Sequence, residues 1–378
     1  MNRMHLSVVV GIATVIIAPQ PGSAPRTLGA PTAVSDQEFT GIDGVRELRD
    51  GRVVVLDARE RTIQVIDPKS KTARKIGRDG DGPGEFRLPL SFLSLGGDTT
   101  LVTDMARFGK LLVITPAGEM GGFVTTEDKA LSPRNFVVAA VDKAGNFYEN
   151  NYGGDSNSIV RWNRARGRRD TIAHISMKVV SPLIRPRPTA GSAPQGALQR
   201  SGGTPPPFFT LNQWAVSADG HVAIVTPEPY RVTIISPSGV RVQGVPIQTV
   251  PVSVGEAEKA AYRREREGPV PVITFSKGAQ TTSYRKVGYT EPDEWPARLP
   301  PILPDAVSFA SDGKLWVRRA TRAGASTLYD VFDANAKFTY QVTLPARTKL
   351  VGFGAGTVFL ARVDDDDLHY LQRYSLPK

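Results

Sequence analysis

The stretch Gly77-Arg78-Asp79-Gly80-Asp81-Gly82-Pro83-Gly84-Glu85-Phe86 decides the fold of this chain. Four of its ten residues are glycine, a composition that disfavours both helix and strand. The preceding residues, Thr72–Ile76, are patterned as the end of a strand, and Leu90–Leu95 as the start of the next. The stretch therefore predicts a connector between two repeating units of β-structure.

A strand–turn–strand pattern recurs six times along the 378 residues. Each copy has a short apolar run, a glycine turn, a second run, a polar loop and a third run. Three of the five gaps between turn glycines are 43–48 residues, the length of a four-stranded propeller blade. The two longer gaps carry insertions at about 177–208 and 251–304. The turn glycines are Gly51, Gly97, Gly145, Gly220, Gly313 and Gly356.

The pattern predicts an all-β, six-bladed β-propeller with four-stranded antiparallel blades over residues 32–378. The sixth copy ends at Lys378 soon after its third run, which leaves that blade one strand short. An open edge of this kind invites unwanted pairing. We therefore expect the segment Thr32–Ile42 to supply the outer strand of the sixth blade and to close the ring.

The connector also carries a resemblance to a known family. Asp50–Phe86, with the run Gly80-Asp81-Gly82-Pro83-Gly84-Glu85-Phe86 and Pro89, resembles the repeat of NHL-type six-bladed propellers and exported bacterial propellers with one such G-P-G-E-F motif. The match is good over residues 40–120 and thin beyond them. It implies a binding role, of protein and in some members RNA. Gly80, Gly82, Pro83, Gly84, Glu85 and Phe86 would form the blade connector, with Glu85 accepting backbone N–H groups and Phe86 packed between blades.

The first 25 residues are patterned for export. Arg3 and His5 precede the uncharged run Leu6–Ala18, and Pro and small residues follow it. This order is typical of a secretory signal peptide, with an uncleaved anchor as the alternative. We expect a periplasmic or extracellular protein. Its formal net charge of +10 allows an anionic surface as partner, although an exported protein meets little nucleic acid.

Propeller topology predicts which residues share a face. Loops between the second and third strands, the blade connectors and both insertions all belong to the same face, which is richest in irregular chain. Loops on a rigid scaffold commonly carry function. We expect this loop-rich face to bind a protein, a peptide or a cell-envelope glycan. The candidate residues on it are Arg59, Arg61, Arg107, Asp155, Glu228, Arg319, Arg322 and Asp365.

The second insertion contains one predicted helix. Ser253 and Glu256 have the spacing of a capping box, and Gly268 with Pro269 would end a helix over Glu256–Glu267. Its apolar face, formed by Val254 and the alanines 257, 260 and 261, predicts a lid on the disc. A dimer contact is the alternative.

Catalysis is the main alternative to binding. Some six-bladed propellers are metal-dependent lactonases or lyases with a site in the central channel. The predicted inner strands offer only Arg46, Glu47 and Asn212 as polar candidates, so we expect no catalytic residues and no cofactor.

The sequence offers two further candidate sites, one for Ca²⁺ and one for a polyanion. The acidic run Asp364–Asp367 could hold Ca²⁺, although a solvated hairpin tip is the simpler interpretation. A polyanion-binding module is the second alternative. It would use Trp162 and the basic residues Arg161, Arg164, Arg166, Arg168 and Arg169.

Overall fold

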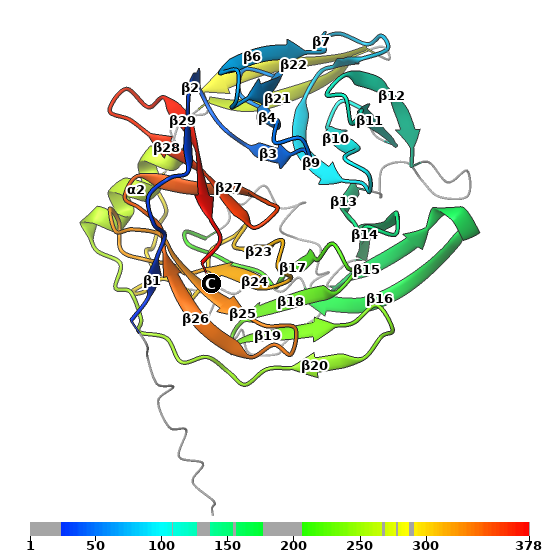
Figure 1. Cartoon of the computed structure of the whole chain (residues 1–378). Coiled ribbons are helices and arrows are strands. Elements are labelled where there is room, and N and C mark those ends of the chain that lie inside the picture. Colours follow the sequence, from blue (N-terminus) through cyan, green and yellow to red (C-terminus); the bar gives the residue numbers. More distant parts are fainter. Residues whose placement is uncertain are drawn as a thin grey trace, which may run out of the picture.

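The computed structural model describes residues 24–107, 109–126, 137–153, 156–176, 206–266, 269–276, 279–286 and 291–377. Six four-stranded antiparallel sheets are arranged as the blades of a ring (Figure 1). In blades one to five the four blade strands are neighbours in sequence order, whereas blade six combines one N-terminal strand with three C-terminal strands. The prediction of an all-β six-bladed propeller is confirmed.

The first three blades precede the first insertion. Blade one contains β3 (Gly44–Glu47), β4 (Val53–Asp57), β5 (Thr62–Asp67) and β6 (Thr72–Ile76). Blade two contains β9 (Pro89–Ser94), β10 (Thr100–Asp104), β11 (Lys110–Ile114) and β12 (Met120–Thr125). Blade three contains β13 (Val137–Val141), β14 (Asn146–Gly153), β15 (Ser156–Asn163) and β16 (Arg168–Ser176).

The remaining blades flank the second insertion and the chain ends. Blade four contains β17 (Gln213–Val216), β18 (Val222–Pro227), β19 (Tyr230–Ile235) and β20 (Arg241–Gln243). Blade five contains β23 (Val307–Phe309), β24 (Leu315–Arg318), β25 (Leu328–Phe332) and β26 (Phe338–Thr343). Blade six contains β27 (Thr348–Gly354), β28 (Thr357–Val363), β29 (His369–Ser375) and β2 (Ala33–Phe39).

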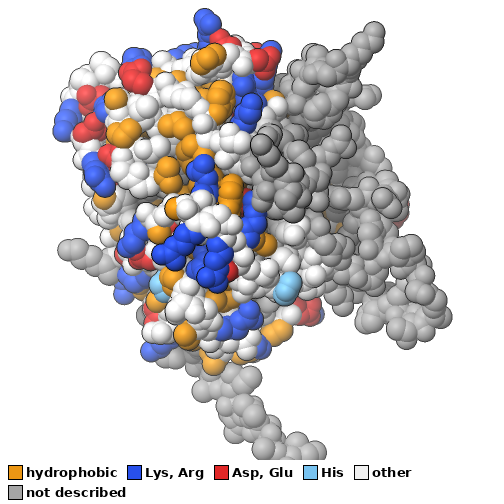
Figure 2. Space-filling view, turned by 90° about the vertical axis from the view of Figure 1, so that its right-hand side faces the viewer, with side chains coloured by type: hydrophobic (Ala, Val, Ile, Leu, Met, Phe, Trp, Pro, Cys, Tyr) orange, Lys and Arg blue, Asp and Glu red, His pale blue; other side chains and the backbone are white. Residues whose placement is uncertain are grey.

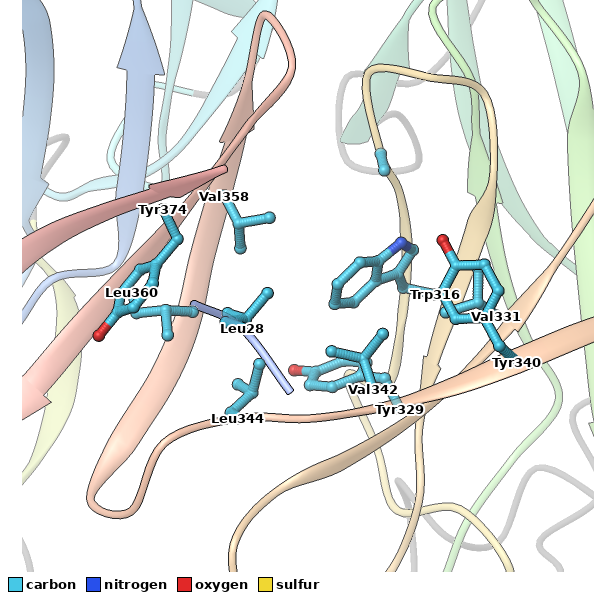
Figure 3. Close-up of a cluster of buried hydrophobic side chains, with 11 residues drawn as sticks. Leu28, Trp316, Tyr329, Val331, Tyr340, Val342, Leu344, Val358, Leu360 and Tyr374 are labelled. Carbon is cyan, nitrogen blue, oxygen red and sulfur yellow. The ribbon is translucent and has the colours of Figure 1, made fainter. Parts of the chain in front are cut away.

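The hydrophobic core is divided among the junctions between blades. Second strands such as β4 are buried on both faces, since each lies between two neighbouring sheets. One cluster occupies the junction of blades five and six, where Trp316 faces Val358 and the N-terminal Leu28 lies between the two sheets (Figure 3). Equivalent clusters occupy the other junctions. Each pair of neighbouring blades therefore buries apolar side chains between its two sheets, which stabilises the ring.

The N-terminal segment closes the ring, as expected from the missing strand. β2 pairs antiparallel with β29, with Ala33 opposite Arg373 and Phe39 opposite His369. Two hydrogen bonds also join blade six to the innermost strand of blade one. There the Glu47 carboxylate accepts the backbone N–H of Ala355 at 2.9 Å and the hydroxyl of Thr357 at 2.8 Å.

One strand was not expected from the sequence. β1 (Arg26–Thr27) pairs in parallel with β26 and adds a short fifth strand to blade five. The Arg26 guanidinium lies 3.7 Å from the centre of the Tyr340 ring, which holds this segment against the blade.

Both insertions occur where the fourth strand of one blade leads to the first strand of the next. Residues 177–205 of the first insertion lie outside the described residues. The second insertion contains α2 (Glu256–Arg266) and a hairpin of β21 (Pro269–Ser276) and β22 (Ala279–Lys286). The helix was expected over nearly the same residues.

Two details of that helix differ from the prediction. The capping carboxylate is Glu258, which accepts the N–H of Gly255 at 3.0 Å, because the helix begins at Glu256, two residues later than a cap at Ser253 implies. The predicted alanine face is exposed; the buried face consists of Glu258 and Tyr262. Tyr262 packs edge-on against Phe208 and Trp295, with ring centroids 5.0 and 5.3 Å away.

Among the described residues, no helix has the length and apolar character needed to cross a membrane. Residues 1–23 of the predicted signal peptide or anchor lie outside the described residues.

Candidate functional site

Seven of the eight candidate binding residues lie in loops that join the second and third strands of a blade. Arg59 and Arg61 follow β4, Arg107 follows β10, Glu228 follows β18, and Asp365 follows β28. Arg319 and Arg322 lie between β24 and β25. The eighth, Asp155, lies outside the described residues. Their shared loop position places the seven on one face of the ring.

Two of these residues hold the blade connector in place. The Arg107 guanidinium donates to the carbonyl oxygen of Gly80 at 2.6 Å and lies over the Phe123 ring. Arg61 pairs with Asp79 at 3.4 Å. Because the Arg107 side chain is only 13% exposed, its guanidinium serves mainly to position the connector.

The connector itself is a compact turn between β7 (Arg78–Asp79) and β8 (Glu85–Phe86), which pair in parallel. The Glu85 carboxylate accepts the N–H of Gly82 at 2.7 Å and pairs with Arg78 at 2.6 Å. A Cβ on Gly80 would collide with that carboxylate. Phe86 is 1% exposed and packs between blades one and two.

The hydrogen bond from Gly82, followed by the one from Arg78, lowers the pKa of the Glu85 carboxyl. The same carboxylate therefore closes the glycine turn and stays ionised there at neutral pH. Pro83 is exposed, and Gly84 has a φ of +73°, a backbone conformation that glycine adopts readily.

The acidic run also has a structural explanation. Asp364 accepts the backbone N–H groups of Asp366 and Leu368 at 3.0 and 2.9 Å, which closes the turn between β28 and β29. Arg347 pairs with Asp365. Within the described residues, no three His, Asp or Glu side chains gather in a way that could hold a metal ion.

The predicted channel candidates are occupied by structural contacts. Glu47 bridges blades one and six, as described above, and also pairs with Arg373 at 2.8 Å. Arg46 lies 3.9 Å from Asp98. Asn212 donates to the carbonyl oxygen of Ser176 at 3.1 Å. These contacts connect neighbouring blades and turns.

The basic patch of blade three is similarly engaged. Figure 2 shows Lys and Arg side chains gathered on the side of the molecule that lies at the right of Figure 1. Arg169 pairs with Glu149 at 2.6 Å and lies 4.4 Å from the Trp162 ring centre. Arg168 and Arg161 both pair with Asp170. Two carboxylates thus pair with three of the five arginines, and Arg164 lies over the Phe147 ring at 4.8 Å from its centre.

A groove on the loop-rich face is the strongest candidate site. It has a volume of about 370 Å³ and lies between blades four and five. Two candidate residues, Glu228 and Arg319, line it. The rest of its wall comes from the segments 246–252 and 298–301 at the two ends of the second insertion. We call this feature the blade 4–5 groove.

A buried polar network lies directly beneath the blade 4–5 groove. Asp330 is fully buried and accepts hydrogen bonds from the Tyr230 hydroxyl at 2.8 Å and from Gln341 at 2.7 Å. It also pairs with Arg319 at 3.1 Å. Burial, and then the nearby Asp330 charge, raise the pKa of the Tyr230 hydroxyl well above its ordinary value. The Tyr230 hydroxyl therefore stays protonated and fixes the position of Asp330.

A second cavity of about 460 Å³ lies at the junction of blades six and one, between β2 and β6. The register of β2 against β29 shifts between Val34 and Glu38, and this part of β2 lines the cavity. It contains none of the candidate binding residues. Blades of a propeller splay outward from the axis, which is a sufficient explanation for it.

The sequence analysis grouped Glu228, Arg319 and the insertion 251–304 on one face, but it did not single out the segments 246–252 and 298–301 as groove walls. One signal was present in the sequence. Proline is concentrated on both sides of the groove, at Pro227, Pro229, Pro246, Pro251, Pro300 and Pro301.

No protein-family model matches the chain, and no curated protein is significantly similar to it in sequence. Solved structures share the fold at low identity. A streptogramin B lyase is 12% identical, with a TM-score of 0.40 over 90% of this chain and 87% of that chain. A calcium-binding protein, regucalcin, from Agrobacterium tumefaciens is 12% identical, with a TM-score of 0.43 over 94% of this chain and 97% of that one.

A putative exported protein from Bacteroides fragilis is 13% identical, with a TM-score of 0.45, covering 92% of this chain and 94% of its own. These similarities concern the fold alone, because one propeller fold supports many unrelated activities. The functional argument therefore depends on the chain's own residues.

Proposed function

We propose that the protein is an exported, non-catalytic binding propeller that recognises a protein, peptide or envelope glycan through its loop-rich face. The blade 4–5 groove is the observation that carries this proposal. Its volume of about 370 Å³ is that of a ligand site. Its wall combines proline and aliphatic side chains with the polar residues Glu228, Gln248, Thr249, Arg298 and Arg319. Two candidate residues line it.

Two sequence features and one set of contacts support the rest of the proposal. The pattern of residues 1–25 favours export to the periplasm or the extracellular space. The resemblance of Asp50–Phe86 to NHL-type repeats favours a binding role. Chemistry at the channel is disfavoured, since Glu47 is already engaged by Ala355, Thr357 and Arg373.

Site-specific photo-cross-linking tests which face binds. The photoreactive residue benzoylphenylalanine replaces Arg322, an exposed residue of the loop-rich face outside the groove. The matched control carries it at Arg49, which is 80% exposed beside the turn between β3 and β4 on the opposite face. Cells that export the protein are irradiated, and adducts are compared. We expect envelope adducts from position 322 and none from position 49.

Equal adducts from both positions, or none from either, would contradict the proposal.

Metal analysis of the purified protein addresses the enzyme alternative. Stoichiometric Ca²⁺ or Zn²⁺ that resists dialysis would favour a metal-dependent lactonase or lyase instead.

A further inference from the structure

The blade 4–5 groove has features that select among the ligands named above. We propose that it binds a peptide segment of a protein partner, with an apolar side chain in the groove and charged side chains at its rim. This proposal rests on the proposed function and specifies its ligand. The argument uses the groove wall, the fixed guanidinium of Arg319, and the two exposed charges of the rim.

The wall of the groove favours an aliphatic or proline side chain. Six of the lining residues are proline, which has no backbone N–H to donate. Val250, also in the wall, is 87% exposed, so its side chain is open to a ligand. Tyr230, the one aromatic residue of the lining, is 4% exposed and offers no open ring to a sugar. Among these residues a sugar ring would find no open aromatic face on which to stack. Gln248 and Thr249 also line the groove and can form hydrogen bonds with a peptide main chain.

Arg319 supplies one oriented donor to this apolar site. Its Nε donates to the carbonyl oxygen of Pro301 at 3.1 Å, and its Nη1 donates to Asp330 at the same distance. Its Nη2 makes no hydrogen bond to any described residue, which leaves one N–H donor group on a side chain that lines the groove. Because Asp330 balances the charge of Arg319, this donor suits a neutral main-chain carbonyl of a peptide.

The rim carries one charge of each sign. Glu228 and Arg298 line the groove, are exposed, and make no ion pair with any residue that the structure describes. A basic side chain of the bound segment would pair with Glu228, and an acidic one with Arg298. Such rim charges contribute more to specificity and association rate than to affinity. The expected ligand therefore has an apolar residue flanked by a basic and an acidic residue.

Peptide display provides the test. A phage library of random 12-residue peptides is selected on the full chain, and the enriched peptides are synthesised and titrated by fluorescence anisotropy. We expect Val250→Asp to raise Kd about tenfold or more, since it places a carboxylate in the apolar wall. We expect Glu228→Gln to raise Kd by about threefold, and only for peptides that contain Lys or Arg.

Val240→Asp is the matched control. Val240 is also an exposed valine, at 62%, but lies near the β19–β20 turn and does not line the groove. Its Kd should stay within about twofold of the unmodified chain. Binding that survives Val250→Asp would overturn the groove proposal, and so would failure to enrich any peptide.

Cross-linking distinguishes failure of the proposed binding face from failure of the proposed peptide ligand. Adducts from position 322 without peptide enrichment would reject the peptide ligand and keep the binding face. Retention on immobilised chito-oligosaccharide that is lost in Val250→Asp would replace the peptide by a glycan. Absence of adducts and of peptides together would reject both the face and its ligand.

Discussion

Phe39 and Phe86 occupy equivalent positions in two consecutive blade junctions, 47 residues apart. Phe39 ends β2 and is 3% exposed, in the cluster between blades six and one. Phe86 ends β8 and is 1% exposed, in the cluster between blades one and two. Each follows a glutamate, Glu38 or Glu85. The segment that closes the ring thus repeats the Glu-Phe end of the glycine connector.

The two residues after each phenylalanine are anchored in the same way. The N–H groups of Thr40 and Gly41 donate to the carboxylate of Asp57 at 2.9 and 3.0 Å. Those of Arg87 and Leu88 donate to Asp104 at 2.8 and 2.9 Å. Each aspartate ends the second strand of the blade that the connector enters. One carboxylate therefore holds the end of each connector against the blade that the chain enters.

The burial of Phe86 predicts a large loss of stability on truncation. Phe86→Ala should lower the free energy of unfolding by about 3–5 kcal/mol, because it removes a fully buried ring and leaves a cavity between two blades. Urea unfolding followed by tryptophan fluorescence measures this. Leu90→Ala is the control, since Leu90 is 44% exposed, and should cost about 1 kcal/mol or less. Equal effects would contradict the assignment of Phe86 to the core.

The Glu47 contacts predict a weak point at the ring closure. Glu47→Ala should lower the free energy of unfolding by about 2–4 kcal/mol, because it leaves the Ala355 N–H and Thr357 hydroxyl without their acceptor and partly strands Arg373. Glu119→Ala is the matched control. It removes a 2.7 Å pair with Arg74 in which both side chains are more than half exposed, and should cost about 0–1 kcal/mol.

The pairing of β2 with β29 predicts that the N-terminal segment is needed for folding. A chain that begins at Gly41 should lose its cooperative thermal transition, because it exposes the edge of β29 and removes Phe39 from its cluster. A chain that begins at Ala30 loses only β1 and Leu28 and should keep a cooperative transition. Circular dichroism and size-exclusion chromatography compare the two. A cooperative, monomeric shorter chain would show that another segment closes the ring.

The Glu85 carboxyl predicts an acid-sensitive connector. Its pKa is lowered in the folded state from its ordinary value of 4.5, so its contribution to stability is present above that value and is lost as pH falls through the folded-state pKa. Glu85→Gln should therefore show a smaller change in urea midpoint between neutral pH and pH of about 3 than the unmodified chain. Parallel pH dependences would mean that the carboxylate does not fix the turn.

The six repeats could be read from local pattern alone, because glycine turns and short apolar runs are determined by neighbouring residues. The helix of the second insertion was predictable for the same reason. Its buried face was not. Tyr262 is covered by Phe208 and Trp295, which lie 54 and 33 residues away in the chain, and no local periodicity contains that information.

Ring closure was predictable from counting strands, but its second connector motif was missed. Glu38-Phe39 lacks the glycines that mark Gly77–Phe86, because β2 reaches that point as a strand paired with β29. The arginines of the loop-rich face were likewise grouped by loop position only. Tertiary contacts decide that Arg107 holds the connector while Arg319 lines a groove.

The sequence by itself determined the number of blades, the chain segment that closes the ring and the face on which the loops gather, since these follow from the order and spacing of local elements. Only the tertiary structure decided where that face is hollow. The blade 4–5 groove brings together Glu228, Thr249, Arg298 and Arg319, and its shape depends on the packing of two blades against both ends of an insertion. Contacts between such distant segments are set by three-dimensional packing, and the spacing of residues along the sequence does not predict them.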